Sequence, residues 1–200
     1  GPGDRRFVVR GDGSLVVFEV GTSPPAQSGF RIVGAHTDSP NLRVKPRPDL
    51  RAHGYRQIGV EPYGGVLLHT WLDRDLSLAG RVGLQSGSGL QSVLIDFARP
   101  LLRIPNLAIH LGREIKDEGL KLNPQQHMAP VIGLEDAPEL RDLLATELRA
   151  RGLADIAPDR VLSFDLMAYD VQPASVFGAR GEFIDAPRLD NLASSHAALV

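Results

Sequence analysis

A histidine and an aspartate two residues apart are the side chains of this sequence best suited to chemistry. His36 and Asp38 lie in the segment Gly-Ala-His-Thr-Asp-Ser-Pro, residues 34–40, directly after an apolar run. Side chains two residues apart at the end of a strand project to the same side, so the histidine can bind a metal ion while the carboxylate orients its ring. The alternative is a hydrogen bond between the two side chains that only stabilises a loop.

Two further residues are candidates for the same site. Asp190 lies in Arg-Leu-Asp-Asn-Leu, residues 188–192, where a helix is predicted to begin. Its carboxylate could reach the same metal ion, or it could cap the helix by accepting backbone N–H bonds. His110 lies between two apolar residues, a pattern that favours a core histidine with a satisfied ring.

The composition limits the metal ligands, the partners and the cellular location that we expect. The chain has no cysteine, so a metal ion would need nitrogen and oxygen ligands. A net charge of −2 and scattered arginines give no basic stripe, which argues against a nucleic-acid partner. No apolar run approaches the roughly 18 residues that a membrane-spanning helix needs, and the first residues do not lead into a signal peptide. We therefore expect no membrane partner and a cytoplasmic location.

The elements that position the candidates follow from pattern and turn residues. Residues 7–10 and 15–20 predict a hairpin about a glycine-rich turn, and residues 30–35 predict a short buried strand that ends at His36. Proline at 46 and 48 should end the next strand. Further strands are predicted at residues 55–60, 66–71, 76–84, 92–97, 161–171 and 181–184.

Three helices are predicted. Pro105 should open a short helix through Leu111. Asp136 should cap a second helix that ends at Gly152, with Leu140, Leu144 and other leucines on one face. Residues 191–200 begin a third helix with no terminating signal, and the chain has no initiator methionine. We therefore expect the sequence to be a fragment of a longer protein.

The order of these elements predicts one lobe interrupted by another. Residues 1–45 and 175–200 should share one sheet, while residues 46–174 form an inserted, β-rich meander or small barrel-like lobe. The sequence contains no His-Glu-x-x-His, no Gly-x-Ser-x-Gly, no phosphate-binding loop and no dinucleotide fingerprint. These absences argue against zincin proteases, α/β-hydrolases and nucleotide enzymes.

Taken together, the segments resemble the aspartyl aminopeptidases, a family of dinuclear zinc exopeptidases that includes vacuolar aminopeptidase I. The resemblance covers nearly the whole chain and keeps the order of the motifs. They are residues 34–40 with 42–46, 61–65, 69–76, 103–111 and 181–192. The resemblance implies an α/β fold: part of a zinc-exopeptidase catalytic domain, with an inserted dimerisation lobe that helps to build dodecamers from dimers.

The resemblance also implies residue roles. His36 matches a zinc ligand, Asp190 matches the aspartate that bridges two zinc ions, and Asp38 matches the catalytic-site acid that orients the zinc-bound histidine. His110 matches a substrate-binding histidine of the inserted lobe that reaches an active site across a subunit boundary. The implied reaction releases an N-terminal aspartate or glutamate from a peptide, with two zinc ions in a complete active site.

Several functional residues of the family have no counterpart in this sequence, and two alternative functions remain. The family's paired glutamates, a further acidic ligand and a final histidine ligand lie downstream of residue 192, so we expect these 200 residues alone to be inactive. A non-catalytic oligomerisation module is the alternative from another functional class. A glutamyl or deblocking aminopeptidase of the same chemistry is a third reading, which residues 105–111 disfavour.

Overall fold

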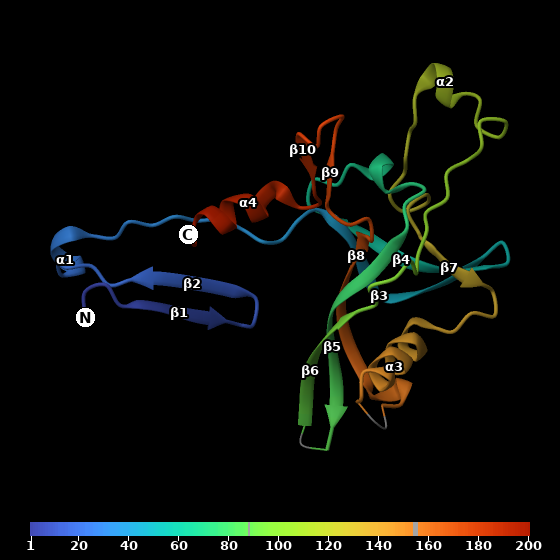
Figure 1. The fold of residues 1–200 in the computed structure, drawn as a ribbon. Helices are drawn as coiled ribbons and strands as arrows, with labels where there is room; N and C mark the ends of the chain where they lie inside the picture. The colour runs from blue at the N-terminus through green and yellow to red at the C-terminus, as the bar shows by residue number, and fades with distance from the viewer. Residues whose placement is uncertain (88, 154–155) are drawn as a thin grey trace. The chain divides into compact units, whose positions relative to one another are not determined.

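The computed structural model describes residues 1–87, 89–153 and 156–200. The chain forms two compact units, coloured along the sequence in Figure 1. Unit 1 consists of Gly1–Ser39 and Ser175–Val200, and unit 2 consists of Pro40–Ala174. The fold is mixed α/β with a large antiparallel sheet, in agreement with the predicted class. Unit 2 begins at Pro40 rather than at residue 46, because the strand that starts at Asn41 pairs within its sheet.

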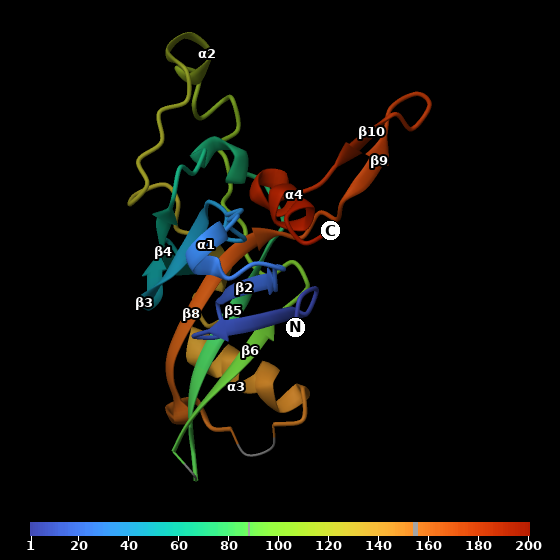
Figure 2. The same cartoon turned by 90° about the vertical axis from the view of Figure 1, so that its left-hand side faces the viewer.

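A six-stranded antiparallel sheet forms the centre of unit 2. Its strands lie in the order β6-β5-β8-β3-β4-β7. The bounds are β3 Asn41–Ala52, β4 Tyr55–Tyr63, β5 Leu76–Ser86, β6 Gly89–Asp96, β7 Val131–Leu134 and β8 Val161–Asp170. The last strand, β8, lies between the hairpins β3–β4 and β5–β6 (Figure 2). The sheet is therefore neither a simple meander nor a barrel in the part of the chain that the structure describes.

The two faces of this sheet differ because strand residues alternate between them. Leu78 and Leu42 both lie opposite Ala168, and all three are buried on the inner face. On the outer face Arg43 Nε lies 2.9 Å from Asp165 Oδ1 across neighbouring strands. The hydrophobic core of the protein thus lies against one face of the sheet.

Helix α3, Leu140–Ala150, covers that inner face and confirms the predicted helix. Leu140, Leu144 and Leu148 recur every four residues and are fully buried. The predicted cap at Asp136 is wrong, because the N-cap residue is Glu139 and its side chain makes no capping bond. Instead Asp49 Oδ1, from β3, accepts the backbone N–H of Leu140 at 3.0 Å. A tertiary contact has taken over the capping role.

Strand β3 does not end at its prolines as predicted. It continues to Ala52, and the pairing register with β4 shifts between Val44 and Asp49. Pro46 and Pro48 fall within this irregularity, where a proline removes no required ladder hydrogen bond.

Two other predicted elements in unit 2 are wrong. The strand expected at residues 66–71 is a 3-10 turn, η1, Leu68–Trp71. The helix expected at residues 105–111 is irregular chain with a turn at residues 109–111. There Asp73 Oδ1 accepts the N–H of Asn106 at 3.1 Å, and Asn106 Oδ1 accepts the N–H of Leu107 at 2.9 Å. Side-chain acceptors thus occupy the first backbone donors of the expected helix.

The remaining elements of unit 2 are short. Helix α2, Ile115–Glu118, interrupts the polar loop that follows residue 111, and the 3-10 turn η2, Pro158–Arg160, leads into β8. No helix among the described residues is long and apolar enough to cross a membrane.

Unit 1 consists of short elements with little burial of their own. The predicted hairpin is confirmed as β1 Arg5–Arg10 and β2 Ser14–Glu19. It is followed by α1 Pro25–Ser28. The second segment contains the hairpin of β9 Ser175–Phe177 and β10 Phe183–Asp185, and then α4 Leu189–Ala197, which overlaps the helix predicted at residues 191–200. Every residue of these four strands is exposed.

The strand predicted at residues 30–35 is absent. Residues 29–40 have no regular secondary structure, and Ile32 is 86% exposed. A strand exists only through backbone hydrogen bonds to a neighbour, and no described strand pairs with this segment. The prediction of a short buried strand at residues 30–35 is therefore wrong in both its secondary structure and its burial.

Candidate metal centre

The His36 ring is held on one side by Asp38. His36 Nδ1 lies 2.9 Å from the backbone carbonyl oxygen of Asp38 and 3.2 Å from its Oδ1. Both partners are acceptors, so Nδ1 carries the proton and donates it. Nε2 is then left with a lone pair, which is the form of histidine that binds a metal.

Asp190 lies on the free side of the same ring. His36 Nε2 is 3.8 Å from Asp190 Oδ1, although the two residues are far apart in sequence. A nitrogen and an oxygen ligand on one tetrahedral zinc would be about 3.4 Å apart, from bond lengths of roughly 2.0 to 2.2 Å. The His36 side chain is half exposed and that of Asp190 is 95% exposed. The structure therefore brings His36 and Asp190 together. The distance between their donor atoms is close to the distance between two ligands of one zinc ion.

Two serines hydrogen-bond the backbone of these segments. Ser39 Oγ donates to the backbone oxygen of Asp190 at 3.3 Å, and Ser195 Oγ donates to the backbone oxygen of His36 at 3.1 Å. Sequence reasoning missed both residues. A serine next to a candidate ligand carries no signal of its own, so only the tertiary structure reveals this role.

The backbone around Asp190 is irregular. Arg188 is the N-cap residue of α4, with a left-handed φ of 64° and no capping side-chain bond. Asp190 has φ −86° and ψ 108°, outside the helical region, and the peptide bond that follows it is cis. The residue at the N-cap position of α4 is thus Arg188, and the carboxylate of Asp190 lies on the side of His36.

The donor set fits part of a zinc site. One imidazole nitrogen and one carboxylate are suitable ligands, and Asp38 orients the imidazole as zinc-binding histidines require. No group of three or more histidine, aspartate or glutamate side chains placed to hold a metal exists within residues 1–87, 89–153 and 156–200. The described residues thus supply two of the four ligands that zinc usually takes.

His110 belongs to unit 2 and is described apart from this pair. It lies in the exposed turn at residues 109–111, so the core position that its apolar neighbours suggested is wrong. Arg103 fixes the start of the irregular segment that contains His110. Its Nη1 lies 2.7 Å from Asp75 Oδ1, and its Nη2 donates to the backbone oxygen of Asp73 at 2.9 Å. Ile109 is exposed too, because the segment leaves the sheet instead of packing on it.

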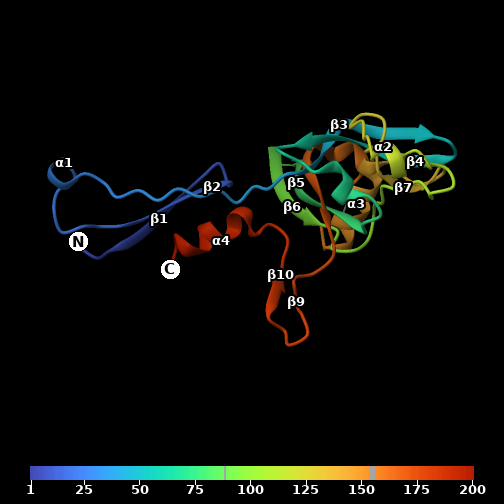
Figure 3. The ribbon, with the colours of Figure 1, turned by 90° about the horizontal axis from the view of Figure 1, so that it is seen from above.

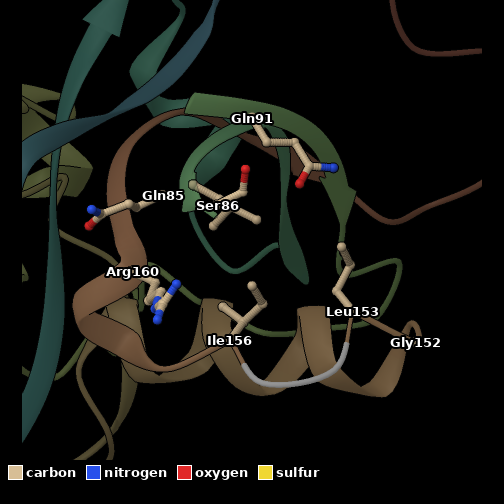
Figure 4. Close-up of a pocket in the computed structure, with 8 residues that line it drawn as sticks. Gln85, Ser86, Gln91, Gly152, Leu153, Ile156 and Arg160 are labelled. Carbon is tan, nitrogen blue, oxygen red and sulfur yellow. The ribbon is translucent and has the colours of Figure 1, made fainter. Parts of the chain in front are cut away.

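A cavity of about 410 Å³ lies elsewhere in unit 2, beside the end of α3 (Figure 4). Its lining contains no histidine and no carboxylate, so it has no metal-binding character. The residues that line it are Leu84, Gln85, Ser86, Gln91, Gly152, Leu153, Ile156 and Arg160.

Comparison with known proteins identifies the family. The whole chain, residues 1–200, matches the family described as aminopeptidase I zinc metalloprotease, M18. The chain belongs to the M18 family. This match confirms the aminopeptidase family and zinc as its metal, and it leaves the roles of individual residues as predictions.

Curated bacterial proteins are similar to nearly all of this M18 chain. It is 50% identical over 201 residues to a probable M18 family aminopeptidase 2 of Stutzerimonas stutzeri, covering 98% of this chain and 46% of the relative. It is 51% identical over 192 residues to a protein of the same name in Streptomyces coelicolor, covering 96% and 43%. The chain thus spans a little under half the length of these curated relatives.

Solved M18-like structures have the same fold. A cryo-EM structure of the Ape4 and Nbr1 complex superimposes with a TM-score of 0.89 at 39% identity, covering 100% of this chain and 42% of that one. The structure of an S. cerevesiae mApe1 dodecamer gives a TM-score of 0.73 at 29% identity, covering 98% and 44%.

Proposed function

We propose that this M18 chain is part of a zinc-dependent aminopeptidase that releases N-terminal acidic residues from peptides. The observation that carries the proposal is the pairing of His36 Nε2 with Asp190 Oδ1 at 3.8 Å, with Nδ1 occupied by Asp38. The unprotonated Nε2 and the Asp190 carboxylate both present lone pairs to the space between them, and both are suitable zinc ligands.

Each residue has a defined task in this proposal. His36 and Asp190 would hold zinc, of which a complete active site would take two ions. Bound zinc would polarise the scissile carbonyl and lower the pKa of a water molecule. Asp38 keeps the proton on Nδ1 and so keeps Nε2 free to bind. His110, on its exposed turn, contacts the substrate.

The assembly belongs to the same proposal. Unit 2 has a complete hydrophobic core and would serve as the dimerisation lobe, with dimers assembling further as in the S. cerevesiae mApe1 dodecamer. The preference for acidic residues is carried over from the resemblance of residues 34–46 and 103–111.

Zinc binding and turnover test the proposal together. In the whole enzyme that contains this sequence, aspartyl and glutamyl p-nitroanilides should be cleaved at least tenfold faster than leucyl and lysyl ones. His36→Ala should lower zinc content and reduce turnover by at least 100-fold, since a lost ligand weakens the site. His53→Asn, an exposed histidine of unit 2, is the matched control and should change neither. Unchanged zinc content in His36→Ala would contradict the proposed ligand.

The 200 residues alone should be inactive, because their described part provides two zinc donors and no group of three or more metal-binding side chains. This same observation favours a second candidate function, a non-catalytic oligomerisation module. Metal analysis of the isolated chain separates the candidates. Two tightly bound zinc ions per chain would contradict the module, whereas none or one weak ion with a defined oligomer would favour it.

A further inference from the structure

The chain leaves the sheet of unit 2 in one long loop, residues 105–130, that contains His110 and α2 (Figure 1). Figure 3 shows this His110 loop from above. Backbone bonds join the two ends of the loop. The N–H of Arg103 donates to the oxygen of Val131 at 3.0 Å, and the N–H of Val131 donates to the oxygen of Arg103 at 2.8 Å. The base of the loop is therefore fixed, but further contacts must set the direction in which the chain leaves it.

Asp73 supplies those contacts with three different groups. Its backbone N–H donates to the oxygen of Ile104 at 2.9 Å, and its backbone oxygen accepts Arg103 Nη2 at 2.9 Å. Its Oδ1 accepts the N–H of Asn106 at 3.1 Å. A single residue thus binds the outgoing chain at successive positions up to Asn106, which restricts the direction that the chain takes beyond it.

The backbone of Asp73 has the left-handed conformation, with φ 58°. Aspartate and asparagine adopt this conformation more readily than most other residues with a side chain, and glycine adopts it freely. Glycine, however, offers no acceptor to the N–H of Asn106. Position 73 therefore needs a residue that tolerates a positive φ and also carries a side-chain oxygen, and such unusual backbone conformations are concentrated at functional sites.

The hold of Asp73 continues to His110 through further hydrogen bonds. Asn106 Oδ1 accepts the N–H of Leu107 at 2.9 Å. The N–H of Leu111 then donates, at 2.8 Å, to the backbone oxygen three residues before it and closes the turn that contains His110. Leu107 and Leu111 are 58% and 74% exposed, so packing against the core does not hold this turn. Its position depends on the hydrogen bonds that begin at Asp73.

We propose that Asp73 is a positioning residue for the substrate contact of His110. Its carboxylate fixes the start of the turn, so the turn presents the imidazole in one place and less freedom is lost when a substrate binds. Asp73 does not touch the substrate itself. The inference rests on the proposed function, from which it takes the substrate contact of His110, but the hold of Asp73 on the turn can be measured without substrate.

Hydrogen exchange of the peptide containing residues 107–111, in the whole enzyme that contains this sequence, measures that hold. Asp73→Gly removes the carboxylate but keeps the left-handed backbone, so exchange should become about fivefold faster or more. Asp73→Asn keeps an acceptor oxygen and should stay within about twofold of the wild type. His53→Gly, at an exposed residue with φ 54°, is the matched control and should leave the peptide unchanged. Unchanged exchange in Asp73→Gly would overturn the proposal.

Kinetics of the same variants test the positioning role. Asp73→Gly should raise KM for an aspartyl p-nitroanilide about fivefold or more, with zinc content unchanged, and Asp73→Asn should keep the KM of the wild type. In a His110→Ala background Asp73→Gly should change KM by less than about twofold, because its effect acts through His110. A full additional loss in that background would refute the positioning role. An unchanged KM in His110→Ala alone would contradict the substrate contact of the proposed function and the positioning role with it, even where exchange shows that Asp73 holds the turn.

Discussion

At the scale of single residues, the two nitrogens of His36 have separate tasks. Nδ1 is occupied by two oxygens of Asp38, one on the backbone and one on the side chain. The backbone contact would persist if the carboxylate were removed, so the ring orientation does not depend on charge alone. Nε2 is directed to Asp190, and this separation fixes the tautomer that the proposed role as a zinc ligand requires.

Tyr169 gives a residue-scale prediction about pH. Burial raises the pKa of Tyr169 above its ordinary value of 10.0, and the hydrogen bond from its hydroxyl to Asp96 Oδ1, 2.5 Å long, raises it further. Because the folded pKa is the higher one, the stabilisation is complete below about pH 10 and is lost as the pH rises through the folded pKa.

Urea unfolding between pH 8 and 11 measures this dependence. The stability advantage of the wild type over Tyr169→Phe should be constant up to about pH 10 and should shrink above it, since phenylalanine does not titrate. Tyr55 and Tyr63 are present in both proteins, so the comparison isolates Tyr169. A difference that stays constant to pH 11 would contradict the assigned environment of Tyr169.

At the scale of elements, α3 closes the core of unit 2, and one of its leucines gives the second prediction. Leu144 is fully buried, so Leu144→Ala should lower the free energy of unfolding by about 2 to 5 kcal/mol through lost burial and a residual cavity. Thr146→Ala, an exposed position of the same helix, should cost no more than about 0.5 kcal/mol. Urea denaturation measures both. A small effect at Leu144 would mean that the helix is not packed on the sheet as described.

Elements were predictable where local pattern and tertiary packing agree. The hairpin β1–β2 and helix α3 follow from a glycine turn and from leucines every four residues. The strand at residues 30–35 and the helix at residues 105–111 failed because their outcome depends on partners distant in sequence. In the expected helix, Asp73 accepts the backbone N–H of Asn106. In the expected strand, residues 30–35 have no described strand to pair with.

The candidate site was predictable to the same degree. His36 and Asp38 are neighbours in sequence, so spacing alone suggested their contact. Asp190 could be joined to them only through the family resemblance, since nothing local links residues that far apart. Ser39 and Ser195 could not be found at all, because their hydrogen bonds to backbone oxygens exist only in the folded chain.

At the scale of the whole molecule, the two units differ in how much each buries. Among residues 1–87, 89–153 and 156–200, the buried hydrophobic core lies entirely in unit 2. The strands and helices of unit 1 contain no buried residue, and Phe7 remains 69% exposed. The free energy of folding therefore resides in unit 2, because burial of apolar surface is its main source.

This difference predicts that residues 40–174 fold on their own. The isolated segment should give a dispersed NMR spectrum and one cooperative unfolding transition, and its amides should resist hydrogen exchange more than those of unit 1 in the 200-residue chain. Unit 1 amides as well protected as those of β5 and β8 would contradict this expectation.

The central position of β8 also sets an order of events during synthesis. Arg43 and its partner Asp165 are 122 residues apart, so the two hairpins of the sheet can be joined only after β8 has been made. His36 and Ser195 are 159 residues apart, with unit 2 encoded between them. At about 5 to 20 residues per second, His36 leaves the ribosome roughly 8 to 30 s before the segment that contains Asp190. The pair of His36 and Asp190 can thus form only after the lobe between its two halves has been translated.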